Sequence, residues 1–273
     1  MVALPYILDS YYYIFEELSS PITKGWFLTR KPYLMIGLVT AYYYFCTNLG
    51  PRLMKHRKPF HLAKVLLVYN VVQIIVNFYI IIEAIRYVFL SNYYDMRCKG
   101  LETDEKIATW VANGMWVYYL LKVSELLDTV FFVLRKSLRQ ITKLHLHHHM
   151  LMVITCWFGT TYYPGGQWVL IGFLNSIVHV IMYFYYLISG LGNRYKKYVW
   201  WKKYVTIVQL VQFVLIAIYN INSMFYECSY PFFYKFFGTF YSVFFFTHFA
   251  KFYYDTYVNP KPKRKTLNNI KKQ

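Results

Sequence analysis

The histidines at positions 145–149 are the part of the sequence best suited to chemistry. They form the run His145-Leu146-His147-His148-His149. If this segment is helical, with 100° between successive residues, His145, His148 and His149 share one face and His147 points away from it. Neutral imidazole acts in proteins as a metal ligand, a proton carrier or a nucleophile. Three imidazoles on one face therefore indicate metal binding or imidazole chemistry rather than ordinary packing.

A second helical stripe is charged. Lys122, Glu125 and Asp128 recur at three-residue steps inside an apolar run. A charge at the centre of a membrane costs about 2.5–3.5 kcal/mol on insertion scales, so this stripe must face the interior of the protein. It could belong to an active site, or it could be an internal ion pair that only joins helices.

Two further apolar segments each carry polar side chains at helical spacing. These residues are Asn175, His179, Met182 and Tyr186, with Tyr183 beside them, and then Thr206, Gln209 and Gln212. Taken alone, a single histidine among aromatic residues is usually a core residue, and the amides could provide hydrogen bonds between helices worth about 0.6 kcal/mol each. Four polar stripes in one bundle nevertheless favour a buried polar chamber.

The composition identifies the elements that must position these residues. The chain has 273 residues, of which 58% are hydrophobic and only 15% charged. These values exclude a disordered or collagen-like chain, and four cysteines are too few for a disulfide scaffold. Crossing about 30 Å of hydrocarbon takes roughly 20 apolar residues. Seven stretches come near that length: Pro32–Leu49, Leu62–Leu90, Ile107–Leu134, Leu144–Tyr163, Trp168–Leu187, Tyr204–Ile221 and Phe232–Tyr254. We therefore predict an all-α polytopic membrane protein with seven transmembrane helices.

The distribution of Lys and Arg predicts the orientation. Most of the 30 basic residues fall in the regions 52–64, 135–143 and 194–203 and in the tail from Lys261, whereas the intervening loops are acidic or short. Basic residues near helix ends stay on the cytosolic side. We expect a luminal N-terminal segment (1–31), a seven-helix domain (32–257) and a basic cytosolic tail (258–273). Within the first, residues 6–18 are expected to form a surface helix or loop. Membrane lipid is the expected surrounding, and no nucleic-acid partner is indicated.

The cysteines agree with this arrangement. Cys98 and Cys228 fall in the two longer luminal loops, where oxidation is permitted, while Cys46 and Cys156 lie within spans. We predict a Cys98–Cys228 disulfide. Two free loop thiols are the alternative.

Several motifs in this order resemble those of the fatty-acid elongase family, and the resemblance covers nearly the whole chain. The motifs are Gly50-Pro51, Arg57-Lys58-Pro59-Phe60, Lys122-x-x-Glu125-x-x-Asp128-Thr129, His145-x-x-His148-His149, Asn175-x-x-x-His179-x-x-Met182-Tyr183-x-Tyr185-Tyr186 and Thr206-x-x-Gln209-x-x-Gln212. Each motif alone would be suggestive, and together on separate spans they are highly specific. At position 147, where the family often has another aromatic residue, this chain has histidine.

The resemblance implies an acyltransferase of the endoplasmic reticulum membrane, with seven helices around a buried acyl-chain tunnel. Such an enzyme condenses a long-chain acyl-CoA with malonyl-CoA, releases carbon dioxide and CoA, and gives a 3-oxoacyl-CoA two carbons longer. It needs no cofactor or metal. The implied partners are 3-ketoacyl-CoA reductase, 3-hydroxyacyl-CoA dehydratase and enoyl-CoA reductase, and a homo-oligomer is also expected. The tail matches a dilysine retrieval signal only loosely.

The family's chemistry can be carried onto individual residues. His148 would carry the acyl group as an acyl-imidazole, with His179 facing it. His145, His149, Asn175 and Gln209 would orient the imidazoles or donate to developing oxyanions. Lys122, Glu125 and Asp128 would set imidazole tautomers or position the malonyl carboxylate. The remaining substrate-binding positions of the motifs are Met182, Tyr183, Tyr186, Thr206 and Gln212. Lys202 and Lys203 belong to a basic cytosolic loop and would bind the phosphates of CoA. Direct attack of the malonyl enolate on acyl-CoA, without a covalent intermediate, stays open.

Other functions fit the sequence less well. A di-iron desaturase or hydroxylase also uses His-x-x-His-His, but it needs about eight ligands, and of the eight histidines here His56, His61 and His248 stand apart. A seven-helix receptor needs no imidazole cluster, and a transporter usually shows internal repeats or broken helices. Cys156, which lies eight residues beyond His148, is expected to be a small core residue rather than a nucleophile.

Overall fold

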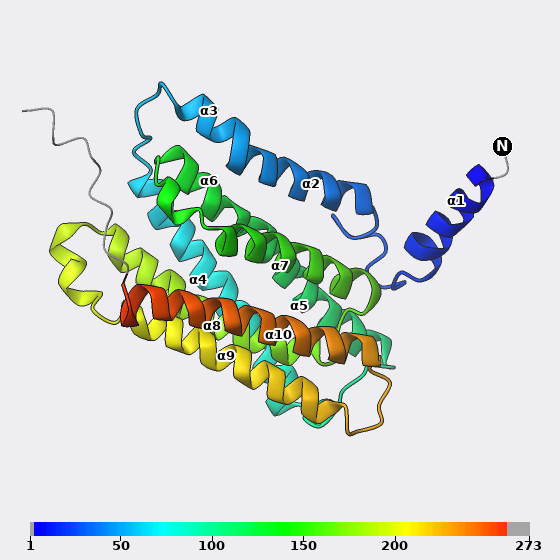
Figure 1. Ribbon diagram of the computed structural model, residues 1–273. Coiled ribbons are helices and arrows are strands. Elements are labelled where there is room, and N and C mark those ends of the chain that lie inside the picture. Colours follow the sequence, from blue (N-terminus) through cyan, green and yellow to red (C-terminus); the bar gives the residue numbers. More distant parts are fainter. Residues whose placement is uncertain (1–2, 261–273) are drawn as a thin grey trace, which may run out of the picture.

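The chain folds into a bundle of long helices (Figure 1), and the computed structural model describes residues 3–260. Within that range no β-strand is present. The α-helices are α1 (Ala3–Tyr12), α2 (Pro32–Tyr44), α3 (Gly50–Met54), α4 (Ala63–Ile85), α5 (Glu105–Ser124), α6 (Leu126–Leu134), α7 (Lys143–Tyr162), α8 (Trp168–Gly190), α9 (Lys202–Ser223) and α10 (Phe232–Tyr253). Short π-helical turns extend α2, α4 and α10 at their C-terminal ends. The prediction of an all-α protein is confirmed.

The long helices run side by side along one direction, while α1 projects away from the bundle (Figure 1). Helix α4 packs along α8, α9 along α10, and α5 against α7. The cluster of buried hydrophobic residues joins α2, α4, α5, α6 and α7, with the ring of Trp157 at its centre only 1% exposed.

Three helices have the length and apolar composition of a membrane span. They are Ala63–Leu90, which is α4 with its π-helical turn, Trp168–Gly190 and Lys202–Ser223. Large apolar side chains such as Val68, Ile75 and Ile218 are 58–60% exposed on their outer faces, as expected of surfaces in contact with lipid. The chain is therefore a multi-pass membrane protein. Helices also occupy the other four predicted stretches.

The third predicted stretch is not one continuous helix. Helix α5 ends at Ser124 and α6 begins at Leu126, so Glu125 stands alone between them. The backbone N–H of Asp128 donates to the carbonyl of Glu125, three residues earlier, at 3.2 Å, which tightens the turn at this point. The sequence pattern gives no sign of this interruption, because neither proline nor glycine occurs near Glu125 and the apolar run continues through it.

One end of the bundle, here called the disulfide end, is closed by the loops that carry Cys98 and Cys228. The two cysteines form a disulfide with their Cα atoms 6.0 Å apart. The hydroxyl of Tyr163 donates to the carbonyl of Ser229 at 2.8 Å and accepts from the N–H of Leu101 at 3.2 Å. These bonds join the same two loops to the turn between α7 and α8.

The segment that precedes α2 is also fixed to the disulfide end. The hydroxyl of Thr23 donates to the carbonyl of Thr160 at 2.8 Å, and that of Thr161 donates to the carbonyl of Thr29 at 3.1 Å. Further out, the Arg30 guanidinium donates to the carboxylate of Glu16 at 2.7 Å and holds the pKa of that carboxyl below its usual range. The helix expected near residues 6–18 is present as α1 and the π-helical turn Tyr13–Glu17.

The opposite end, here called the basic end, carries the loops at 55–62, 135–142 and 191–201. A cavity of about 170 Å³ lies there between the start of α4 and the ends of α6 and α8, and both His61 and Arg135 line it. Most of the predicted basic tail, residues 261–273, lies outside the described residues.

Peptide mapping without reduction should recover a fragment in which Cys98 is linked to Cys228, because their Cα separation is within the range that a disulfide spans. Cys46 and Cys156 are buried and unpaired, and both should become alkylatable once the protein is denatured. Recovery of four alkylated cysteines from protein never exposed to reductant would contradict the pairing.

Candidate active site

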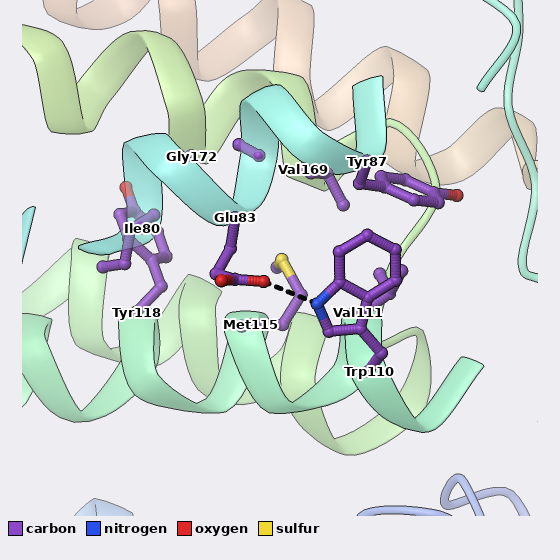
Figure 2. A pocket seen from close by; sticks show the side chains of 11 residues that line it. Ile80, Glu83, Tyr87, Trp110, Val111, Met115, Tyr118, Val169 and Gly172 are labelled. Atoms are coloured by element: carbon purple, nitrogen blue, oxygen red, sulfur yellow. Dashed lines mark hydrogen bonds between the residues drawn. The ribbon is translucent and has the colours of Figure 1, made fainter. Parts of the chain in front are cut away.

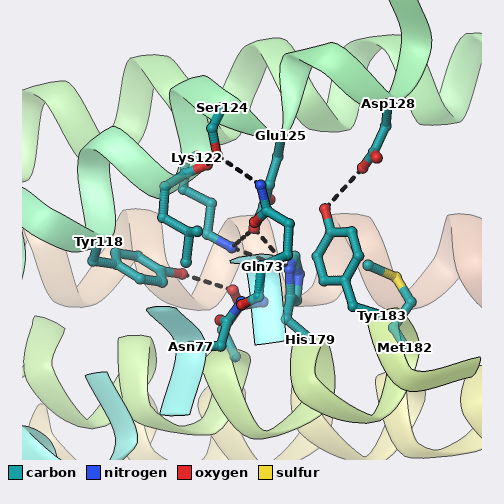
Figure 3. Close-up of polar contacts among 12 residues, drawn as sticks. Gln73, Asn77, Tyr118, Lys122, Ser124, Glu125, Asp128, His179, Met182 and Tyr183 are labelled. Carbon is teal, nitrogen blue, oxygen red and sulfur yellow. Dashed lines mark hydrogen bonds and ion pairs between the residues drawn. The ribbon is translucent and has the colours of Figure 1, made fainter. Parts of the chain in front are cut away.

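The charged stripe converges with His179 in the middle of the bundle (Figure 3). Lys122 Nζ and Glu125 Oε1 lie 2.8 Å apart, and His179 Nδ1 lies 2.9 Å from the same oxygen. The side chains of Lys122 and Glu125 are each 1% exposed, and that of His179 is 7% exposed. Helix α5 thus supplies a lysine, the residue between α5 and α6 a carboxylate, and α8 an imidazole to one buried group, which we call the Lys–Glu–His triangle.

The triangle fixes the tautomer of its histidine. His179 Nδ1 lies 2.9 Å from Glu125 Oε1 and 3.3 Å from Lys122 Nζ. A carboxylate oxygen can only accept a hydrogen bond, so the shorter contact, with Glu125, places a proton on His179 Nδ1. In a neutral ring the lone pair then lies on Nε2. Glu125 therefore orients His179 in the way that a carboxylate orients the histidine of a catalytic pair.

Tyr118 connects the triangle to α8 by a second route. Its ring centroid lies 4.8 Å from Lys122 Nζ, a cation–π contact, and its hydroxyl donates to Asn175 Oδ1 at 2.8 Å. Asn175 is 7% exposed. The sequence analysis identified Asn175 but missed Tyr118, which is one of 31 tyrosines and belongs to none of the quoted motifs.

Asp128 is buried beside the triangle but has a different partner. Its Oδ2 accepts a hydrogen bond from the Tyr183 hydroxyl at 2.8 Å. The stripe Lys122, Glu125 and Asp128 faces the interior, as expected, since all three residues are less than 9% exposed. Only the first two form the ion pair.

The histidines at the start of α7 have distinct surroundings. Thr142 caps this helix by accepting from the N–H of His145 at 3.1 Å, which sets the position of the first histidine. His145 Nε2 lies 2.9 Å from Thr129 Oγ1, and that oxygen lies 2.6 Å from the Tyr42 hydroxyl. The rings of His145 and His149 are 4.3 Å apart. Helices α2 and α6 thus hold His145 through a chain of two hydroxyls.

His148 is held by aromatic contacts instead. Its ring lies edge-on to Phe245 at 4.9 Å and to Phe249 at 6.0 Å, both from α10. Between residues 3 and 260, no hydrogen bond to this ring is present, so its nitrogens are available to a ligand. His147 is exposed, in agreement with the helical-wheel prediction that it points away from the other three.

Some of the remaining candidate residues are buried or contact one another, and the two lysines lie apart from the triangle. Thr206 and Gln212 are buried on α9, and Gln209 Nε2 lies 3.7 Å from the sulfur of Met182. Tyr186 packs against Tyr183 with 5.9 Å between ring centroids, but it is 39% exposed. Lys202 and Lys203 are exposed at the first turn of α9, at the basic end, and do not contact the triangle.

Two amides of α4 also join the site, and the sequence analysis missed them. Gln73 is 1% exposed and Asn77 is fully buried. Gln73 Nε2 donates to Ser124 Oγ at 2.8 Å, and Asn77 Nδ2 donates to the Gln73 carbonyl at 2.8 Å. Within residues 3–260, the side-chain oxygens of both amides have no hydrogen-bond partner. Asn70, Gln73 and Asn77 recur at helical spacing in a strongly apolar span, and this pattern could have identified them.

In the part of the chain that the structure describes, no group of three or more His, Cys, Asp or Glu side chains is arranged to hold a metal ion. Cys156 is 4% exposed on α7.

The bundle and its buried charged group define a multi-pass helical membrane protein with a polar site inside it. The GNS1/SUR4 (ELO) family matches residues 27–265. The chain is 37% identical over 252 residues to very long chain fatty acid elongase 7 of Drosophila melanogaster, with 92% of this chain and 76% of that protein covered. It is 36% identical to elongase 7 of Rattus norvegicus, with 92% and 90% covered, and 37% identical to elongase 1 of Homo sapiens, with 78% and 77% covered. The chain belongs to the ELO family, whose named relatives are enzymes of fatty-acid elongation.

Glu125→Gln should destabilise the fold by about 3 kcal/mol, because it leaves the Lys122 ammonium buried without an anion. Asp128→Asn is the matched control. It makes the same change one helical turn away, and the new amide oxygen can still accept from Tyr183, so its cost should be about 1 kcal/mol. Equilibrium unfolding in mixed detergent micelles measures the free energy of unfolding of both variants. Equal decreases in the two variants would contradict a specific contribution of the Lys122–Glu125 ion pair to stability.

Proposed function

We propose that this protein is the condensing enzyme of fatty-acid elongation. It joins a long-chain acyl-CoA to malonyl-CoA and releases carbon dioxide, CoA and a 3-oxoacyl-CoA two carbons longer. The observation that carries the proposal is the presence, in one membrane bundle, of two different imidazoles. Within the described residues His148 has aromatic contacts but no hydrogen bond to its ring, whereas His179 is held by a carboxylate. Relatives named as very long chain fatty acid elongases support the same assignment.

The acyl transfer begins at His148. One ring nitrogen attacks the thioester carbonyl of acyl-CoA, a carbon–nitrogen bond forms, and the carbon–sulfur bond breaks to release CoA. The proton of the imidazole passes to the leaving sulfur. The aromatic side chains of α10 exclude water from this position, which protects the acyl-imidazole from hydrolysis.

The condensation consumes the acyl-imidazole. Malonyl-CoA loses carbon dioxide, and its enolate carbon attacks the acyl carbonyl. The carbon–nitrogen bond breaks, and the leaving imidazole takes up a proton from solvent, which restores His148. Negative charge develops on the enolate oxygen and then on the acyl oxygen. The Lys122 ammonium and amide groups such as that of Asn175 are the donors that would stabilise it, and one such donor is typically worth about 2.7–4 kcal/mol. Glu125 would keep His179 in one tautomer throughout.

CoA would bind at the basic end. Arg135 and His61 line the cavity there, and Lys202 and Lys203 are exposed nearby on α9. Arginine and lysine form charge-assisted hydrogen bonds to phosphate, and CoA carries three phosphate groups. The thioester would then reach inward from this end to the histidines of α7.

The proposed membrane topology follows from placing the basic end, where CoA would bind, in the cytosol. Seven helices would cross the endoplasmic reticulum membrane around an acyl-chain tunnel, with the disulfide end in the lumen and the basic end in the cytosol. Reductases and a dehydratase would complete each elongation cycle. A homo-oligomer is compatible with this arrangement.

Incubation of the purified protein with radiolabelled acyl-CoA, without malonyl-CoA, should place the label on His148, and later addition of malonyl-CoA should remove it as extended product. His148→Ala should lose both the label and about a thousandfold or more of the extension rate, as expected for a nucleophile. His147→Ala is the matched control, since this ring is exposed one residue away. Cys156→Ala should also keep its activity.

Two other outcomes would contradict the covalent route or the enzyme assignment. Extension that persists in His148→Ala, with no labelled protein, would replace the covalent route with direct attack on acyl-CoA. Failure of the unaltered protein to extend any primer in a panel of acyl-CoAs would remove the enzyme assignment itself.

A further inference from the structure

Helix α1 and the π-helical turn Tyr13–Glu17 together form a helical arm outside the bundle, here called the arm (residues 3–17). In Figure 1 the arm leaves the disulfide end and runs across the direction of the long helices. Its side chains Leu8, Tyr12 and Ile14 are 42–61% exposed. We propose that the arm lies in the membrane surface at the disulfide end, with its apolar side chains among lipid acyl chains and its acidic side chains in water.

The residues of α1 divide between two faces. With 100° between successive residues, Leu8, Tyr11 and Tyr12 fall within an arc of about 100°. Ser10 lies roughly 160° from Leu8, and Asp9 lies roughly 160° from Tyr11. A helix with one apolar, aromatic face and one polar face lies in the plane of a membrane surface. The ten residues of α1 and the five of the turn reach only about 22 Å, which is too short to cross the membrane.

Contacts with α7 hold the arm at the depth of a membrane surface. Helix α7 has 20 residues, or about 30 Å at the rise of an α-helix, which equals the thickness of the hydrocarbon layer. The Phe15 ring packs against the Trp157 ring with 6.4 Å between centroids, and Trp157 lies five residues, about 7.5 Å, before α7 ends. The N–H of Ser20 donates to the carbonyl of Thr161 at 2.8 Å. The arm therefore begins just inside the boundary between hydrocarbon and headgroups.

The same boundary is marked on α4 and α5. Figure 2 shows Trp110 Nε1 donating to Glu83 Oε2, at 2.6 Å. Arg86 donates to the other oxygen of Glu83 at 2.9 Å, and its side chain is 58% exposed. Exposed charges avoid hydrocarbon, and tryptophan is enriched where the membrane meets water. Glu83 lies 20 residues after Ala63, where α4 begins at the basic end, again about 30 Å. Both α4 and α7 thus place the boundary one hydrocarbon thickness from the basic end.

The charge of the arm indicates which lipids it meets. The arm contains Asp9, Glu16 and Glu17 and no basic residue. Surface helices that bind anionic lipids carry lysine and arginine on their polar face, so an acidic arm favours zwitterionic headgroups such as phosphatidylcholine. Lys24 and Arg30 lie 3.4 Å and 2.7 Å from the Glu16 carboxylate. These ion pairs fix the point at which the arm leaves the bundle.

A nitroxide label on each face of α1 tests the proposal. Leu8→Cys and Ser10→Cys, made in the full chain and held singly in phosphatidylcholine nanodiscs, should place their labels about 10 Å apart in depth, the diameter of a helix. The Leu8→Cys label should collide mainly with oxygen, which concentrates in lipid, and the Ser10→Cys label mainly with a water-soluble nickel chelate. The unaltered protein, treated in the same way, corrects for any label on the buried Cys46 and Cys156.

Two neighbouring tyrosines give a matched pair of charge variants. Tyr12→Glu, added to Leu8→Cys, puts a carboxylate on the apolar face, so the label should move into water and collide mainly with the nickel chelate. Tyr13→Glu is the control, because this ring is similarly exposed, at 54% against 61%, but follows on the side of Asp9. It should leave the label in lipid. Equal exposure of the Leu8→Cys and Ser10→Cys labels to either reagent would overturn the inference, and so would shielding of both labels from the two reagents, which would show that the arm packs against protein.

Discussion

A lysine ammonium buried inside a membrane protein is the constraint on which the rest of the structure depends. The Lys122 side chain is 1% exposed, so its charge must be balanced within the bundle, and Glu125 does this at 2.8 Å. The carboxylate in turn needs further donors, and His179 supplies one. Each of these requirements fixes a helix. α5 must end where Glu125 can turn inward, and α8 must pack closely enough to bring His179 to the same oxygen.

The same constraint explains why α4 carries amides along its length. Ser124 lies beside the triangle, and Gln73 satisfies its hydroxyl while Asn77 binds the backbone of Gln73. Polar side chains on a spanning helix are costly against lipid, so they also require that α4 packs tightly along α8. The bundle is therefore stabilised by a buried ion pair and by the hydrogen-bonded amides beside it, in addition to the apolar cluster that contains Trp157.

The sequence predicts the faces of the helices better than it predicts the contacts between them. Lys122, Glu125 and Asp128 had to face inward, because lipid excludes charge, and they do. Their partners depend on side chains of other helices, so the pairing of Asp128 with Tyr183 rather than with Lys122 was not predictable. Tyr42 and Tyr118 were missed because the chain has 31 tyrosines and nothing in the sequence marks these two. The break at Glu125 was missed because tertiary pairing, not propensity, places it.

Tyr118 joins the buried charge on α5 to the buried amide on α8. The ring shields one side of the Lys122 ammonium, and its hydroxyl fixes Asn175. In the proposed reaction, these two contacts keep the ammonium and the amide in fixed positions while negative charge develops on the substrate. Donors that stabilise a developing oxyanion work only when their positions are fixed in advance, so the contacts of Tyr118 would contribute to the condensation as well as to the packing of α5 against α8.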